Sequence, residues 1–197
     1  MRYGFLNLPA PTTDWGVGFK EIGQYNGFNP DKKLTTVLPN GETQGIAVYE
    51  RVRANFKYKA WLYSIVPELK EDRCEIGFQR IINKTNHPNG AVLLPHSDGL
   101  RGPFVLSYNF DVGGANCPTV YWQEEGHPIN REQGLQTNFK PNFNQIDSVV
   151  FKSGTWNVLD ARPLHSVHNV ETVRFAFTVG FYREDLFELI KQKYSLH

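Results

Sequence analysis

From residue 75 onward the chain is a succession of short runs rich in β-branched and aromatic residues, punctuated by Gly, Pro and Asn. No helical periodicity separates these runs. They cover residues 75–83, 91–94, 104–111, 119–123, 147–151, 156–159, 166–170 and 173–182. A series of this kind favours a jelly roll or β-sandwich over alternating strands and helices. We therefore expect a mainly β fold with a few supporting helices.

The segment before these runs has a different pattern. Residues 1–45 are rich in Gly, Pro, Asn and Thr, which predicts irregular chain with an edge strand near residues 33–38. Apolar residues then recur every four positions from Val48 to Ala60. This spacing predicts one amphipathic helix, or two with a break, over about residues 46–70.

At 197 residues the chain is long enough for one domain with a substantial core. We expect N-terminal irregular and helical support at 1–72, a β core at 73–182 and a C-terminal helix within 183–197. The polar segment 124–145 is too long for an ordinary connection. It is either a substrate lid or a disordered insertion.

Charge and composition limit the choice of partners. With 21 basic and 20 acidic residues the net charge is +1, so no global field selects a polyanion, and a nucleic-acid partner is not expected. Neither a secretory leader nor an apolar segment of membrane-spanning length is evident, and we expect a soluble cytoplasmic protein. Cys74 and Cys117 are too few for a disulfide framework and lack zinc-site spacing.

A His-x-Asp pair ends the apolar run 92–98. In an extended segment alternate side chains point the same way, so His96 and Asp98 can reach one point together. An imidazole and a carboxylate that reach the same point supply two of the three ligands of a facial metal triad. Because such a pair arises by chance in roughly a quarter of chains of this composition, its context must support the assignment.

His165 and Arg174, both further along the chain, supply that context. His165 follows a glycine turn, an apolar strand and a tight polar turn, and Arg174 lies nine residues further on. In the run that Arg174 heads, Arg174 and Thr178 share one face with small residues, while bulky residues occupy the other. We expect the bulky face to enter the space between the sheets and the small face to leave room for a ligand. His168 is a rival third ligand.

In this arrangement the chain resembles the Fe(II)- and 2-oxoglutarate-dependent dioxygenases, and most closely their prolyl 4-hydroxylase-like branch. The family pattern is His-x-Asp, a distal His and an Arg nine or ten residues later. Its closing pattern matches His165-Ser-Val and Arg174-Phe-Ala-Phe-Thr178. The resemblance implies a double-stranded β-helix in which His96, Asp98 and His165 hold iron at the catalytic centre.

The same resemblance implies the cofactors and the reaction. Arg174 would bind the distal carboxylate of 2-oxoglutarate with help from Thr178, and ascorbate is a candidate reductant. Dioxygen would be the second co-substrate, and hydroxylation of an unactivated C–H bond would release succinate and carbon dioxide. The expected substrate is a prolyl or other protein side chain, a free amino acid or a small metabolite.

Two positions depart from the prolyl-hydroxylase pattern. Where that branch places a cofactor-contacting tyrosine on the strand after His-x-Asp, this chain has Asn109 with Tyr108 adjacent. Ahead of the motif, Asn86 replaces another such tyrosine. These three residues remain candidates for contacting 2-oxoglutarate, since an amide can still donate a hydrogen bond to a carboxylate.

Two other functions stay open. One is a non-catalytic jelly-roll module that binds carbohydrate, and the other is a metal cupin enzyme that does not use 2-oxoglutarate. Neither requires a buried arginine nine residues beyond the third ligand. The surroundings of Arg174 therefore discriminate among the three.

Overall fold

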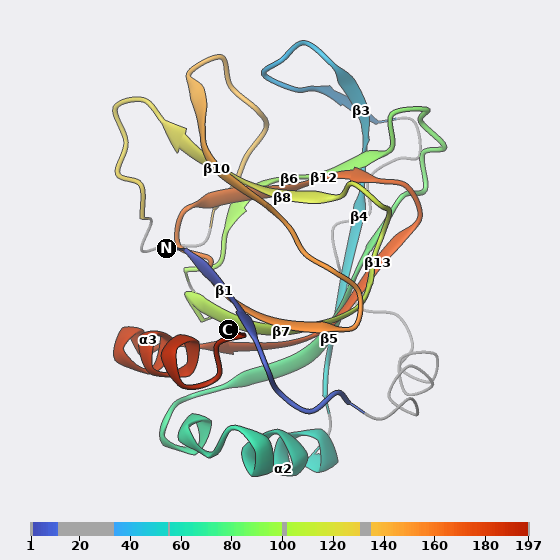
Figure 1. Ribbon diagram of the computed structural model, residues 1–197. Helices are drawn as coiled ribbons and strands as arrows, with labels where there is room; N and C mark the ends of the chain where they lie inside the picture. The colour runs from blue at the N-terminus through green and yellow to red at the C-terminus, as the bar shows by residue number, and fades with distance from the viewer. Residues whose placement is uncertain (1, 12–33, 55, 100–101, 131–134, 197) are drawn as a thin grey trace.

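A computed structural model describes residues 2–11, 34–54, 56–99, 102–130 and 135–196 as two β-sheets that face each other (Figure 1). In spatial order, the six-stranded sheet contains β1 (Tyr3–Leu6), β11 (Thr155–Asp160), β7 (Phe104–Val112), β13 (Val173–Phe181), β5 (Glu75–Ile82) and β4 (Val48–Arg53). The seven-stranded sheet contains β10 (Phe143–Val150), β8 (Pro118–Glu124), β12 (Leu164–Val170), β6 (Ala91–Ser97), β3 (Thr43–Ile46) and β2 (Thr35–Val37), with β9 (Leu135–Gln136) paired to β6.

The path of the chain through these sheets is that of a jelly roll. From β5 to β8, and again from β10 to β13, each successive strand lies in the opposite sheet. Neighbouring strands are antiparallel except for β3 and β6, which run parallel. The mainly β, double-stranded β-helix predicted from the sequence is confirmed.

Two helices, α2 (Phe56–Ile65) and α3 (Glu184–Lys193), lie on the outer side of the six-stranded sheet (Figure 1). The largest apolar cluster forms between them and the sheet, and it includes Phe177 and Val179 of β13. The bulky face of β13 therefore packs against the helices, and the expectation that it enters the space between the sheets is wrong. The helices supply the apolar cover that this face requires.

The helix predicted over 46–70 is wrong in its first part. Residues 48–53 form strand β4, and helix α2 begins only at Phe56. A four-residue interval equals two strand repeats as well as about one helical turn, so Val48 and Val52 share a strand face and are buried there. Phe56, the next residue in that spacing, is 82% exposed.

The remaining predicted elements fall close to their expected places. The edge strand is β2, and each of the eight predicted runs contains a strand, although β10 begins four residues earlier than predicted. The closing helix is α3, in which Leu186 and Ile190 are buried but Leu189 is exposed. Cys74 and Cys117 are both free. Of the irregular chain predicted for 1–45, residues 12–33 lie outside the described residues. Within the described residues, no helix is both long and apolar enough to cross a membrane.

Replacing Phe177 with alanine tests where the main core lies. Phe177 is fully buried among aromatic rings between the sheet and α2, so we expect Phe177→Ala to lower the free energy of unfolding by about 3–5 kcal/mol. Phe56→Ala is the matched control, because an exposed ring contributes within about 0.5 kcal/mol. Urea denaturation of both variants measures the difference, and equal losses would contradict this assignment.

Candidate metal centre

His96 and His165 lie directly opposite each other on the adjacent antiparallel strands β6 and β12. Opposite residues project from the same face of a sheet, and the two imidazole centroids are 4.3 Å apart. Asp98 follows immediately after the end of β6. One ligand atom from each of the three side chains lies within 4.8 Å of the others. The structure thus brings together the three residues that the sequence pattern predicted as metal ligands.

Hydrogen bonds to the backbone orient both imidazoles. Nδ1 of His96 lies 2.8 Å from the carbonyl oxygen of Leu94, and Nδ1 of His165 lies 3.0 Å from that of Pro163. A carbonyl oxygen only accepts, so each Nδ1 carries the proton and donates it. The lone pair of each Nε2 remains available, which is the arrangement that metal-binding histidines use.

The backbone also holds Asp98 beside these rings. Its N–H donates to the carbonyl oxygen of Ala161 at 2.9 Å, which ties the end of β6 to the turn between β11 and β12. Burial, followed by the neighbouring imidazole of His96, lowers the pKa of His165. His165 is therefore neutral at ordinary pH, as a metal ligand must be.

His168, the rival third ligand, projects from the opposite face of the seven-stranded sheet. It is three positions from His165, and an odd separation along a strand reverses the face. Its Nε2 lies 2.6 Å from the hydroxyl oxygen of Ser166, which accepts a bond from the indole N–H of Trp122. Burial lowers the pKa of His168 to about 4, so it is a neutral part of the outer packing.

Arg174 projects from β13 into the space between the sheets. Its side chain donates through Nη1 to the Thr119 hydroxyl on β8 at 3.2 Å, and its guanidinium lies 5.6 Å from the centre of the Phe151 ring. The residue is only 6% exposed, and Nε has no hydrogen-bond partner in the part of the chain that the structure describes. No carboxylate among the described residues pairs with it. Burial lowers its pKa, but a guanidinium remains charged, so a buried cation lacks a counter-charge.

Three further side chains on this inner side carry buried polar atoms that find no partner among the residues described. Both amide atoms of Asn109 and of Asn157 are unpaired, as is the hydroxyl of Tyr121. Asn109 and Asn157 alternate along β7 and β11 with residues that face the helices, so their own side chains face the other sheet. Tyr121 lies opposite His165 on β8, and burial raises its pKa, which keeps its hydroxyl protonated. We call these three residues and Arg174 the inner polar group.

The other predicted cofactor contacts fall in different places. Thr178 is buried on the inner side, where its hydroxyl lies 3.5 Å from the carbonyl oxygen of Gly77. Tyr108 belongs to the apolar cluster under the helices and faces away from the inner polar group. Asn86 is exposed in the connection before β6, at the opposite end of that strand from His96. The structure therefore assigns Asn109, rather than Tyr108 or Asn86, to the inner side.

The sequence interpretation did not single out Tyr121, Asn157 or Thr119. One signal was available for Asn157, since it is the one polar residue within the run 156–159. Tyr121 and Thr119 share one face of β8, a strand that was predicted correctly. Their role depends on which face of β8 lies toward the other sheet, and the sequence of β8 alone does not contain that information.

No family model and no curated protein matches this chain. Among solved structures it is similar to YcfD of Escherichia coli, with 14% identity and a TM-score of 0.49, over 96% of this chain and 52% of that one. It is also similar to a Burkholderia pseudomallei oxidoreductase described as a 2OG-Fe(II) oxygenase, with 13% identity and a TM-score of 0.40, over 75% and 70% of the two chains. A third is SnoK, a non-haem α-ketoglutarate-dependent carbocyclase from nogalamycin biosynthesis, with 11% identity and a TM-score of 0.49, over 91% and 79%.

The present chain thus spans about half of the E. coli protein. Similarities at these identities and TM-scores do not identify the chemistry of the site, which has to be inferred from the residues of this chain.

Removing one predicted ligand tests the metal centre. We expect Asp98→Ala and His165→Ala to weaken cobalt(II) binding by more than the 10- to 100-fold that loss of an outer partner typically costs. Anaerobic titration of the apoprotein with cobalt(II), followed by its visible absorption, measures the affinity. His168→Gln is the matched control and should bind cobalt(II) as the parent does. If only His168→Gln lost cobalt(II) binding, His168 rather than His165 would be the third metal ligand.

Proposed function

We propose that the protein is an Fe(II)- and 2-oxoglutarate-dependent dioxygenase that hydroxylates an unactivated C–H bond. The observation that carries the proposal is the buried, carboxylate-free guanidinium of Arg174, which faces the same inter-sheet space as the two histidines. A metal triad alone fits many reactions. A triad combined with a buried cation that pairs with no carboxylate of the described residues calls for a metal-binding ligand that also carries a second, anionic end.

The donor set fits ferrous iron. Two neutral imidazoles and one carboxylate on one side of a metal leave its other positions open, as in non-haem Fe(II) oxygenases. Iron bound there would supply the redox chemistry of the reaction with dioxygen. The contribution of the chain is to hold the three donors in fixed orientation, which the Leu94 and Pro163 carbonyls and the Ala161 contact accomplish.

The inner polar group fits 2-oxoglutarate. A dicarboxylate can bind a metal through its keto-acid end and present its distal carboxylate to Arg174, whose planar fork donates two parallel bonds. Thr119 already contacts Arg174, and Thr178 lies four residues further along the same face. The unpaired amides of Asn109 and Asn157 are available to hydrogen-bond the rest of the 2-oxoglutarate molecule. Arg174, Asn109 and Asn157, which otherwise bear a burial penalty, would thereby gain hydrogen-bond partners.

One strand within the polar segment 124–145, β9, lies beside the metal centre. It pairs with β6 so that Gln136 lies directly opposite His96. The N–H of Thr137 donates to the carbonyl oxygen of Pro95 at 2.9 Å, so Gln136 and His96 occupy the closer, non-hydrogen-bonded type of pair. Gln136 is exposed and shares the face of His96. Its amide is placed to hydrogen-bond a substrate beside the metal.

The finer assignment to the prolyl 4-hydroxylase-like branch is part of this proposal. Peptidyl proline or another protein side chain is the first substrate class to test, followed by free amino acids and small metabolites. A carbohydrate-binding module or a metal cupin that does not use 2-oxoglutarate would leave Arg174 without a role. Under either alternative, adding 2-oxoglutarate would leave the absorption spectrum of the bound metal unchanged.

The first test is binding of 2-oxoglutarate to the iron-loaded protein. Anaerobic titration should produce the charge-transfer absorption of the chelate. We expect Arg174→Ala to weaken this binding by about 30-fold or more, because removing one partner of a buried charge pair costs about 2–5 kcal/mol. Asn109→Leu should also weaken it, whereas the neighbouring change Tyr108→Phe should not. An unaltered spectrum in folded, iron-loaded parent protein would reject the proposal.

The second test addresses turnover and substrate. A panel of prolyl peptides, other peptides and amino acids, assayed with and without ascorbate, should contain a compound that stimulates succinate release on admitting oxygen. With that compound we expect Gln136→Ala to raise its KM by about fivefold, since a hydrogen bond is worth about 1 kcal/mol, while 2-oxoglutarate affinity stays constant. An unchanged KM would remove Gln136 from the substrate side.

A further inference from the structure

The turn between β11 and β12 supplies a hydrogen-bond acceptor to two of the three proposed metal ligands. The carbonyl oxygen of Ala161 accepts from the N–H of Asp98 at 2.9 Å. Two residues later, the carbonyl oxygen of Pro163 accepts from Nδ1 of His165 at 3.0 Å. These two carbonyls therefore hold the backbone of Asp98 just after β6 and the imidazole of His165 on β12.

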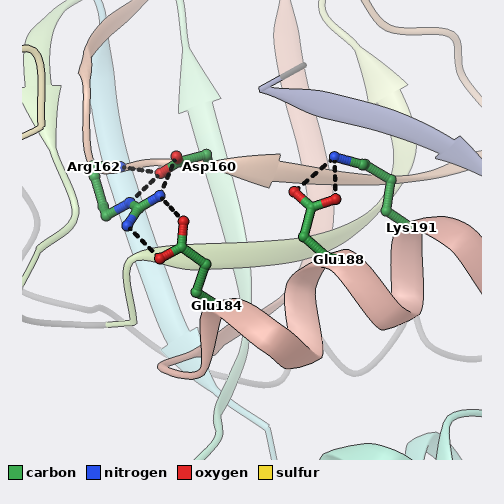
Figure 2. Close-up of polar contacts among 5 residues, drawn as sticks. All are labelled: Asp160, Arg162, Glu184, Glu188 and Lys191. Carbon is green, nitrogen blue, oxygen red and sulfur yellow. Dashed lines mark hydrogen bonds and ion pairs between the residues drawn. The ribbon is translucent and has the colours of Figure 1, made fainter.

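Arg162 lies between these two carbonyls and is the most heavily bonded residue of the turn. Its backbone N–H donates to Oδ1 of Asp160 at 3.0 Å, and its guanidinium donates to both Asp160 oxygens at 2.9 and 2.8 Å. The same guanidinium donates to the two carboxylate oxygens of Glu184, at 2.9 and 3.3 Å, and lies 4.7 Å from the centre of the Phe104 ring. Figure 2 shows Arg162 held between the two carboxylates.

These bonds connect the turn to rigid parts of the fold. Asp160 is the last residue of β11 and is nearly buried, and Glu184 is the first residue of α3. Hydrogen bonds to Asp160, and then to Glu184, raise the pKa of Arg162. Because Asp160 is buried and Glu184 is exposed, the bidentate pair with Asp160 is the stronger restraint and the pair with Glu184 the weaker one.

We propose that Arg162 is a positioning residue for the metal centre, acting through the Ala161 and Pro163 carbonyls on Asp98 and His165. This inference rests on the proposed function, since it concerns the same three ligands. A salt bridge that merely joined α3 to the sheet would stabilise the fold without changing metal affinity. A bridge that sets the direction of both carbonyls changes the geometry of the ligands, and therefore metal affinity and ligand field.

The experiment uses the full chain and cobalt(II) as the probe. We expect Arg162→Gln to weaken cobalt(II) binding by about tenfold, the lower end of the range for outer partners of metal ligands, and to alter the cobalt absorption spectrum. Arg162→Lys keeps the charge but not the fork, and should show the same direction of change. Glu184→Gln should show a smaller effect, because it removes only the exposed partner.

The control is a second ion pair on the same helix. Within the part of the chain that the structure describes, Glu188 pairs with Lys191 at 2.7 Å and not with Arg162 or Asp160 (Figure 2), so Glu188→Gln should leave both cobalt affinity and spectrum unchanged. Thermal unfolding of each apoprotein separates lost stability from lost affinity. If Arg162→Gln and Arg162→Lys bind cobalt(II) with parental affinity and spectrum, Arg162 has only a scaffold role. If the parent itself binds no metal, the proposed function fails as well.

Discussion

The register between β6 and β12 is the constraint on which the site depends. Placing His96 opposite His165 fixes two donors at the separation of neighbouring strands, about 4.8 Å, before any metal is considered. Asp98 then reaches the same point because it lies two residues further along the chain. A slip of one residue would turn His165 toward the outer face and bring no equivalent histidine inward. The ladder hydrogen bonds thus preorganise the donors.

The two faces of the six-stranded sheet have different roles: the outer face stabilises the fold, and the inner face carries the polar groups of the proposed site. The outer face buries aromatic and aliphatic side chains under α2 and α3, and it contains the largest apolar cluster. The inner face holds a charged guanidinium and several amide and hydroxyl groups, with smaller apolar clusters nearby. Unpaired buried polar atoms each cost about 1–3 kcal/mol, so the outer face must supply the free energy that keeps the inner one assembled.

The strands and the ligand triad were predictable because both depend on local pattern: alternation of residue types and fixed spacing along one chain. Val48 was assigned to a helix because its four-residue interval satisfies both periods. Alternation also identified two faces around Phe177 without indicating which of them meets the other sheet. The same limit left Tyr108 and Asn109 undecided. Tyr121 and Asn157 join the site only through pairings between distant strands, which depend on the register of the whole fold.

The unpaired atoms of Asn109, Asn157 and Arg174 also have a consequence for folding equilibria. A ligand that pairs with them binds the folded chain but not the unfolded one, because only the two assembled sheets bring these groups together. By mass action such a ligand stabilises the fold by about 2.7 kcal/mol at one hundred times its dissociation constant. Such a ligand would act as a removable part of the core, and its concentration would change the free energy of unfolding of the chain.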